Sequence, residues 1–371
     1  MPDFTLRVRL DTPLLQSGTD SGRPDPAGAL RGGSLRGLLH TWARALIGPL
    51  LNGDGNKTRE AEKMLLGAAA GENTDDGQTF RIEDNTGLPK PFEVFPPRDK
   101  TAIATLEVTK MSTKEYFALP HRPAPKATPS GDRRWPQDTR APRDGHVSGQ
   151  ERTLLFSVTA QAVKKDLLLL QALRAVVWTT LAFGSLGNRA RRGYGGLTLV
   201  EAGDVPCMPL FGDEDLSREE LETRLTTGLD TAQGMVRKWL ESKGKNPLDL
   251  TAVRSGFDPT TAQHSFFQIA SMAQVRLGNP VVDPDEGNAR IVALMRGCHA
   301  QSLDSDYGRT LGRANFGENR RLASPLWVRF YRIASGQYVP VLTYSPRVVT
   351  TGSAQTMVNA ILNSVGASNF C

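Results

Sequence analysis

The sequence lacks the features of several protein classes. Its three cysteines, Cys207, Cys298 and Cys371, are far apart, and an odd number of distant cysteines argues against a disulfide framework or a Cys-rich zinc site. No apolar run approaches the roughly 20 residues that a membrane span needs. The first ten residues enter an alternating pattern instead of a signal-peptide core. We therefore expect a protein of a bacterial or archaeal cytoplasm, without a membrane partner.

A convincing catalytic or cofactor-binding set is also missing. The five histidines do not pair at a metal-ligand spacing, and the adjacent Cys298 and His299 lack a second ligand pair. The carboxylate pairs at 75–76 and at 304 and 306 lie in polar stretches typical of solvated turns, which disfavours a two-metal nuclease. Neither GxGxxG nor GxxxxGK[ST] occurs. We expect no cofactor, no metal and no enzymatic activity.

The composition is that of a globular protein with a basic bias. Hydrophobic residues make up 39% and charged residues 23% of the 371 residues, which excludes a disordered chain and allows two domains. The formal net charge is +6. A modest positive charge favours an acidic partner without naming it.

Residues 183–197, FGSLGNRARRGYGGL, combine glycine with arginine. Glycine permits close backbone approach, and the arginine fork suits phosphate. The candidate contacts to a polyanion in this Gly-rich loop are Gly187, Arg189, Arg191, Arg192, Gly193, Tyr194 and Gly195. Tyr194 could stack on a base or pack within the loop. The alternative interpretation is a solvated basic turn.

The loop follows a predicted helix over 164–183 and precedes a predicted strand over 197–200. A dinucleotide-binding loop has the opposite order, strand before helix. The order therefore excludes that class of site.

The N-terminal segment predicts a strand followed by an amphipathic helix. Phe4–Leu10 alternates apolar and polar residues. In the helix that follows, Ser34 is a candidate N-cap, and Gly48-Pro49 predicts the end. Arg36, His40 and Arg44 are spaced by four and form a basic stripe. This stripe is either a solvated face or a surface that binds a nucleic-acid backbone.

The order of elements predicts an α+β fold. Residues 1–205 show the β–α–β–β–α–β order of a ferredoxin-like, RRM-type domain, whose sheet often leaves one face for RNA. A proline-rich basic insertion, residues 119–150, interrupts it. Residues 206–371 predict a second α+β domain. Its expected elements are strands at 264–276, 326–333 and 338–343 and helices at 216–240, 289–300 and 355–365.

Three segments resemble the RAMP superfamily of CRISPR proteins, and within it the first-numbered Cmr subunits of the type III-B RNA-guided effector complex. They are the opening strand and helix, the Gly-rich loop, and RRLASPLWVR at 320–329. The matching positions in the opening helix are Arg31, Ser34, Arg36, Gly37, Leu38, Leu39, Trp42, Arg44 and Ala45.

The resemblance implies two tandem ferredoxin-like domains and a non-catalytic, RNA-binding role. The subunit would cap the complex at the 3′ end of the guide (CRISPR) RNA, contact guide and target RNA, and bind other Cmr-type subunits. Arg31, Ser34, Arg36, His40 and Arg44 would join the Gly-rich loop as RNA-binding residues. Some relatives are metal-independent endoribonucleases that process guide RNA. This is the alternative function, with His40 as the candidate acid–base group.

Overall fold

The computed structural model describes about half of the chain. The described residues are 4–12, 14, 32–67, 80–84, 92–95, 126–127, 133–134, 143–145, 151–158, 166–187, 190–202, 208–212, 216–249, 274–282, 284, 326–344 and 368–369.

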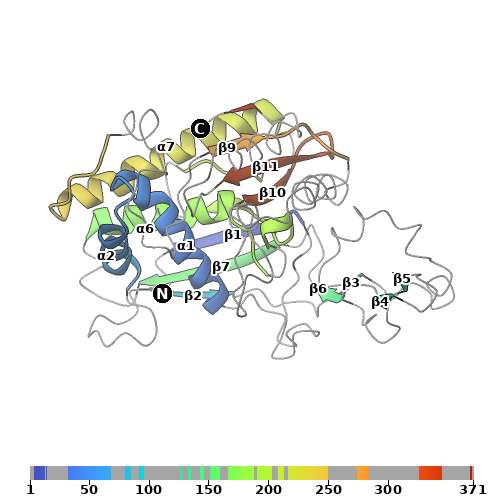
Figure 1. The fold of residues 1–371 in the computed structure, drawn as a ribbon, viewed down its shortest axis with the longest axis horizontal. Coiled ribbons are helices and arrows are strands. Elements are labelled where there is room, and N and C mark those ends of the chain that lie inside the picture. Colours follow the sequence, from blue (N-terminus) through green and yellow to red (C-terminus); the bar gives the residue numbers. More distant parts are fainter. Residues whose placement is uncertain are drawn as a thin grey trace.

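The first sheet has four antiparallel strands in the order β2-β7-β1-β8. Figure 1 shows β2, β7 and β1 side by side. The strands are β1 (Phe4–Leu10), β2 (Phe80–Asp84), β7 (Glu151–Val158) and β8 (Leu197–Ala202). The period of two places Leu6, Val8 and Leu10 on one buried face of β1. The strands predicted over Phe4–Leu10 and over 197–200 are thus confirmed.

Two helices of the first half, α1 (Gly32–Leu50) and α6 (Leu167–Phe183), occur in the predicted order. Two more, α2 (Gly55–Leu66) and α7 (Arg218–Ser242), pack beside them. Asp54, Asp166 and Ser217 cap α2, α6 and α7 by accepting backbone N–H bonds. The last helix packs along α6 and also contacts α1.

The second sheet repeats the connectivity of the first. Its strands are β9 (Gln274–Leu277), β10 (Leu326–Arg332), β11 (Tyr338–Tyr344) and β12 (Ser368–Asn369), in the antiparallel order β10-β11-β9-β12. When the strands of each sheet are numbered in chain order, both sheets have the spatial strand order 2-3-1-4. The predicted hairpin at 326–343 is confirmed as β10 and β11.

Two small pairings lie between β2 and β7. They join β3 (Phe92–Phe95) to β6 (Arg143–Gly145) and β4 (Lys126–Ala127) to β5 (Arg133–Arg134). The last three strands belong to the predicted insertion at 119–150, whose other residues lie outside the described ones. So do the helices predicted at 289–300 and 355–365 and most of the strand predicted at 264–276.

Both predicted ends of the first helix were wrong. The helix begins at Gly32, so Ser34 is an exposed residue of its first turn and not the N-cap. Gly32 and Gly33 carry no side chain, and therefore left no apolar pattern to read. The helix also includes Pro49, because its last turn closes without the missing N–H: Leu51 N donates to Ile47 O (3.2 Å) and Gly53 N to Gly48 O (2.8 Å).

One hydrophobic core runs through both halves of the chain. Trp42 of α1 packs against Phe183 of α6 and against Trp327 of β10, with ring centroids 6.0 and 5.4 Å apart. Tyr331 of β10 packs against Phe211 at 5.1 Å. The second sheet is therefore held to the first half by aromatic packing.

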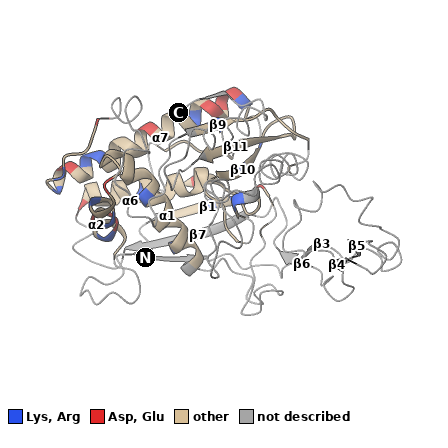
Figure 2. Ribbon diagram, in the orientation of Figure 1, with Lys and Arg blue, Asp and Glu red and all other residues tan. Residues whose placement is uncertain are grey.

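The outer surface of α7 carries charges of both signs (Figure 2). Arg218 pairs with Glu222, Arg224 with Glu220, and Arg237 with Glu241, each at a spacing of four. These pairs neutralise one another, so this face offers little attraction to a polyanion.

The crossing of α6 and α7 generates the first prediction. A Cβ on Gly228 would lie 2.0 Å from the Trp178 ring, which is held by a 2.9 Å bond from its Nε1 to Pro209 O. We expect Gly228→Ala to lower the free energy of unfolding by about 1–3 kcal/mol through overpacking. Urea denaturation measures this.

Gly234 of the same helix is the matched control, since a Cβ there meets nothing within 4 Å. Gly234→Ala should raise stability by about 0.5–1 kcal/mol, the ordinary gain for a helix interior. Equal effects at the two positions would contradict the close crossing.

Candidate nucleic-acid interface

The Gly-rich loop is a closed structure that joins α6 to β8. Ser185 and Gly196 form an antiparallel bridge, and Leu186 N donates to Gly195 O at 2.8 Å. A short 3-10 turn, η2 (Ala190–Arg192), forms its far end. The bridge brings the two ends of the loop together.

Three glycines of the loop adopt a left-handed backbone: Gly187 at φ 79°, Gly193 at φ 82° and Gly195 at φ 72°. Other residues rarely adopt this conformation. At Gly195 a Cβ would also lie 2.0 Å from Leu186 O. These glycines therefore set the shape of the backbone.

Tyr194 is only 2% exposed. Its ring packs within the protein, which is the second of the two roles that the sequence left open. A base cannot stack on it in this conformation.

Arg191 of the loop lies beside β10. The Arg191 guanidinium is 4.2 Å from the centre of the Trp327 ring, a cation–π contact. Gly193 N donates to Val328 O at 3.1 Å. Arg192 belongs to η2, but its side chain lies outside the described part, as does all of Arg189.

A buried arginine from the second sheet holds the base of the loop. Arg329 is 1% exposed. It donates to Gly184 O (3.1 Å), Leu197 O (2.8 Å) and Thr198 Oγ1 (2.9 Å). Gly184 and Leu197 are the residues at the two ends of the loop.

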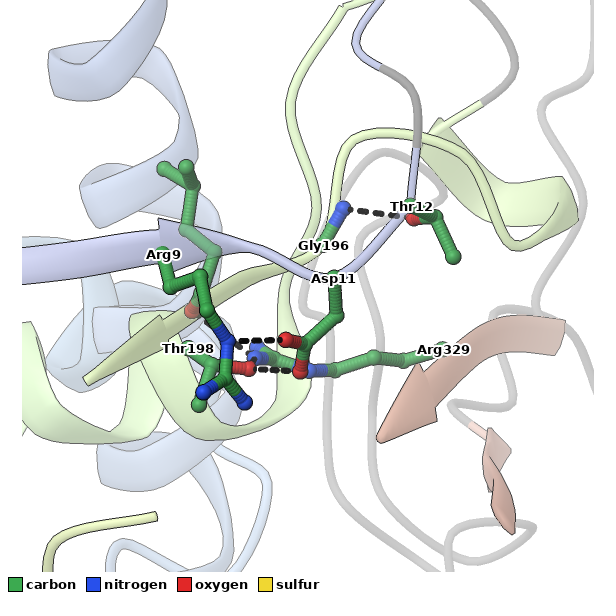
Figure 3. Close-up of polar contacts among 7 residues, drawn as sticks. Arg9, Asp11, Thr12, Gly196, Thr198 and Arg329 are labelled. Carbon is green, nitrogen blue, oxygen red and sulfur yellow. Dashed lines mark hydrogen bonds and ion pairs between the residues drawn. The ribbon is translucent and has the colours of Figure 1, made fainter. Parts of the chain in front are cut away.

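The charge of Arg329 is balanced through Thr198 (Figure 3). The Thr198 hydroxyl donates to Asp11 Oδ2, and Arg9 Nε donates to Asp11 Oδ1 at 3.0 Å. Burial lowers the pKa of Arg329, and the Asp11 carboxylate opposes that shift. An arginine remains charged under such conditions, so the network links a buried guanidinium through a hydroxyl to a carboxylate that also pairs with Arg9.

Tyr331 adds a contact to the helix before the loop. Its hydroxyl donates to Ala182 O at 2.7 Å, and burial raises the pKa of Tyr331. The phenol therefore stays protonated and remains a donor. Its ring also lies 4.2 Å from the Arg329 guanidinium.

The predicted basic stripe on α1 faces α2. His40 Nδ1 lies 2.7 Å from Glu62 Oε1, and Arg44 donates to the same oxygen at 2.7 Å. Arg36 donates to Leu66 O at 3.3 Å, and burial lowers its pKa. The stripe therefore packs against α2 and is only partly exposed, and Glu62 supplies the opposite charge.

The other two predicted residues of this segment are Ser34 and Arg31. Ser34 is exposed at the start of α1, and Arg31 lies outside the described residues. The sequence patterns did not point to five further polar residues of these contacts: Asp11, Glu62, Thr198, Arg329 and Tyr331. The available signal for Arg329 was an arginine in the middle of the apolar strand LWVRFYR.

Within the described ranges, no three His, Cys, Asp or Glu side chains gather as a metal site would require. None of the described helices combines the length and apolarity needed to cross a membrane.

The sequence matches the RAMP superfamily over residues 8–198, just over half of its length. The chain belongs to the RAMP superfamily. The resemblance of the opening helix and the Gly-rich loop is therefore confirmed at the level of the superfamily. No curated protein matches the sequence.

Solved structures resemble this RAMP protein along its whole length. The crystal structure of Cmr1 from Pyrococcus furiosus, in its apo form, has a TM-score of 0.55 at 15% identity, covering 99% of this chain and 98% of that one. A chain of the type III-B Cmr-beta complex bound to cognate target RNA and AMPPnP, state 2, in the presence of ssDNA, has a TM-score of 0.57 at 10% identity, with 98% and 99% covered.

A chain of Cmr-beta bound to cognate target RNA has a TM-score of 0.54 at 12% identity, with 98% of each chain covered. At these identities the likeness shows a shared fold.

The packing of α1 against α2 generates a second prediction. Glu62 is 6% exposed and holds two basic side chains. Glu62→Gln removes its charge with little change in shape. It should lower the free energy of unfolding by about 1–3 kcal/mol, because the bonds from the two basic side chains are then made to a neutral amide oxygen instead of a carboxylate.

Glu60→Gln is the control on the same helix. Glu60 binds Lys245 at the surface, and exposed pairs contribute about 0–1 kcal/mol. Urea midpoints compare the two variants. If Glu62→Gln were as mild as the control, the stripe would not depend on α2.

Proposed function

We propose that this RAMP protein is a non-catalytic, RNA-binding subunit of a type III-B Cmr effector complex. It would cap the end that holds the guide 3′ region, contact guide and target RNA, and bind other Cmr-type subunits. One observation carries the proposal: the likeness to Cmr1 and to chains of target-bound Cmr-beta covers 98% or more of this chain.

We further infer that each sheet belongs to a ferredoxin-like domain. With strands numbered along the chain, both sheets have the spatial order 2-3-1-4, and all neighbouring strands are antiparallel. A split β–α–β arrangement produces this order. The proposed domains are residues 1–205 and 206–371. Since α7 packs on α6, the second domain would begin with a helix that completes the core of the first.

The Gly-rich loop is the proposed RNA-backbone contact. Arg191 is partly exposed and stacked on Trp327, and a stacked guanidinium keeps its donors in one plane, where phosphate oxygens can be reached. Arg189 and Arg192 would contribute to the same contact. The proposed role of the left-handed glycines is to preset the backbone around the RNA.

The basic stripe has a different proposed role. Glu62 and Leu66 O already engage Arg36, His40 and Arg44. These side chains would serve RNA binding indirectly, by holding α2 against α1. Ser34 and Arg31, near the start of the helix, remain proposed RNA contacts.

The second candidate function is a guide-processing ribonuclease without a metal. The His40 ring beside the Glu62 carboxylate supports it, since such a pair can transfer protons. The fold likeness to Cmr1 favours the first candidate.

Incubation with repeat RNA in the presence of a metal chelator separates the two functions. We expect binding without cleavage for the natural protein. Cleavage that disappears in His40→Ala, while the variant stays folded, would replace the scaffold proposal with the nuclease.

The arginines of the loop provide a third prediction. Removing one cation that neutralises a phosphate lowers the salt slope of single-stranded RNA binding by about 0.7. Arg191→Ala/Arg192→Ala should therefore flatten the slope by up to about 1.4 and weaken the binding of unrelated RNAs alike. Fluorescence anisotropy with labelled oligonucleotides over a range of salt concentrations measures both effects.

Lys57→Ala/Arg59→Ala removes the same charge from exposed positions of α2 and should leave the slope unchanged. A folded Arg191→Ala/Arg192→Ala protein with the natural slope would show that these arginines hold protein elements together.

A further inference from the structure

One face of β10 contacts the Gly-rich loop and the two elements that flank it, α6 and β8. Alternate residues of a strand share a face, and Trp327, Arg329 and Tyr331 are alternate residues. Trp327 lies under Arg191 at the far end of the loop, Arg329 binds both loop ends, and Tyr331 binds the last turn of α6. Side chains of the second sheet thus contact the loop and the elements on both sides of it.

Arg329 has the central place on this face. Its guanidinium joins Gly184 O to Leu197 O, so it ties together the two points where the loop leaves α6 and enters β8. A Cβ on Gly196 would lie 3.7 Å from Arg329 Cγ. The arginine stem therefore runs beside the loop backbone as well as binding it.

Because the charge of Arg329 is buried, this arrangement depends on having a guanidinium group at that position. A buried charge is tolerated only when it is paired and hydrogen-bonded. Here Thr198 links it to Asp11, and the two terminal nitrogens of the guanidinium also donate to Gly184 O and Leu197 O. A lysine retains the charge but offers donors from a single nitrogen, which cannot span the same set.

We propose that Arg329 is a positioning residue for the Gly-rich loop: docked from the second sheet, it holds the loop in the conformation that accepts RNA. This rests on the proposed role of the loop in RNA binding. RNA affinity then depends on the docking of β10, and by linkage bound RNA strengthens that docking.

The expected size follows from the fraction of molecules with a competent loop. Apparent affinity falls in proportion to that fraction, so a loop that is competent one-tenth of the time binds about tenfold more weakly. We expect Arg329→Lys to weaken RNA binding by about tenfold or more while the protein stays folded.

The experiment uses the full chain and two readouts. Anisotropy with a labelled single-stranded RNA measures affinity, and hydrogen exchange measures the amides of Leu186 and Gly193, which are bonded to Gly195 O and Val328 O. Both amides should exchange faster in Arg329→Lys, with α7 amides unchanged. Arg332→Lys, on the same strand but exposed, should match the natural protein in both readouts.

A second pair of variants guards against loss of folding and separates positioning from general stability. Thr198→Val removes the bridging hydroxyl and should weaken RNA binding and loosen the loop. Thr198→Ser keeps the hydroxyl and should restore both.

The outcomes are distinct. Arg329→Lys with natural loop exchange or with natural RNA affinity would overturn the positioning role, as would failure of Thr198→Ser to restore what Thr198→Val loses. If the natural protein binds no RNA, the proposed function fails, whereas the exchange data still decide whether Arg329 shapes the loop.

Discussion

A buried network of hydrogen-bonded charged groups between the two halves of the chain is the interaction on which the described structure depends most. Arg329 comes from the second sheet, Asp11 from the end of the first strand, and the Thr198 hydroxyl joins them. Burying such groups separately would cost several kcal/mol each. The halves therefore have to meet in one register, in which the charge is balanced and the carbonyl groups of the loop are bonded.

This constraint explains why the Gly-rich loop is compact despite its composition. A loop rich in glycine and arginine would be expected to lie in solvent. Instead, Tyr194 is buried, Gly193 N is bonded to the backbone of β10, and Arg191 rests on Trp327. Preorganisation of this kind lowers the entropy lost when a ligand binds.

The two sheets have the same strand order, although the sequence patterns of the two halves look different. The described strands of the second sheet include β9 and β12, which have four and two residues and are too short to carry a strong alternating pattern. Their place beside β11 is set by register across the sheet, as in the pairing of Leu342 with Arg276. Pairing between distant segments is a property of the assembled sheet and leaves a weak local signal.

Local periodicity determined most elements of the first half, because alternation in Phe4–Leu10 and the apolar stripe of α1 need no distant partner to be recognised. The motif residues likewise determined the superfamily.

Tertiary structure alone decided what the polar side chains do. The stripe of Arg36, His40 and Arg44 looked open until α2 placed Glu62 beside it, and Arg329 looked like one strand residue among others until folding brought it to Asp11, more than 300 residues away. A sequence pattern records which face a residue occupies, but the partner of a charge comes from another part of the chain, and only folding brings the two together.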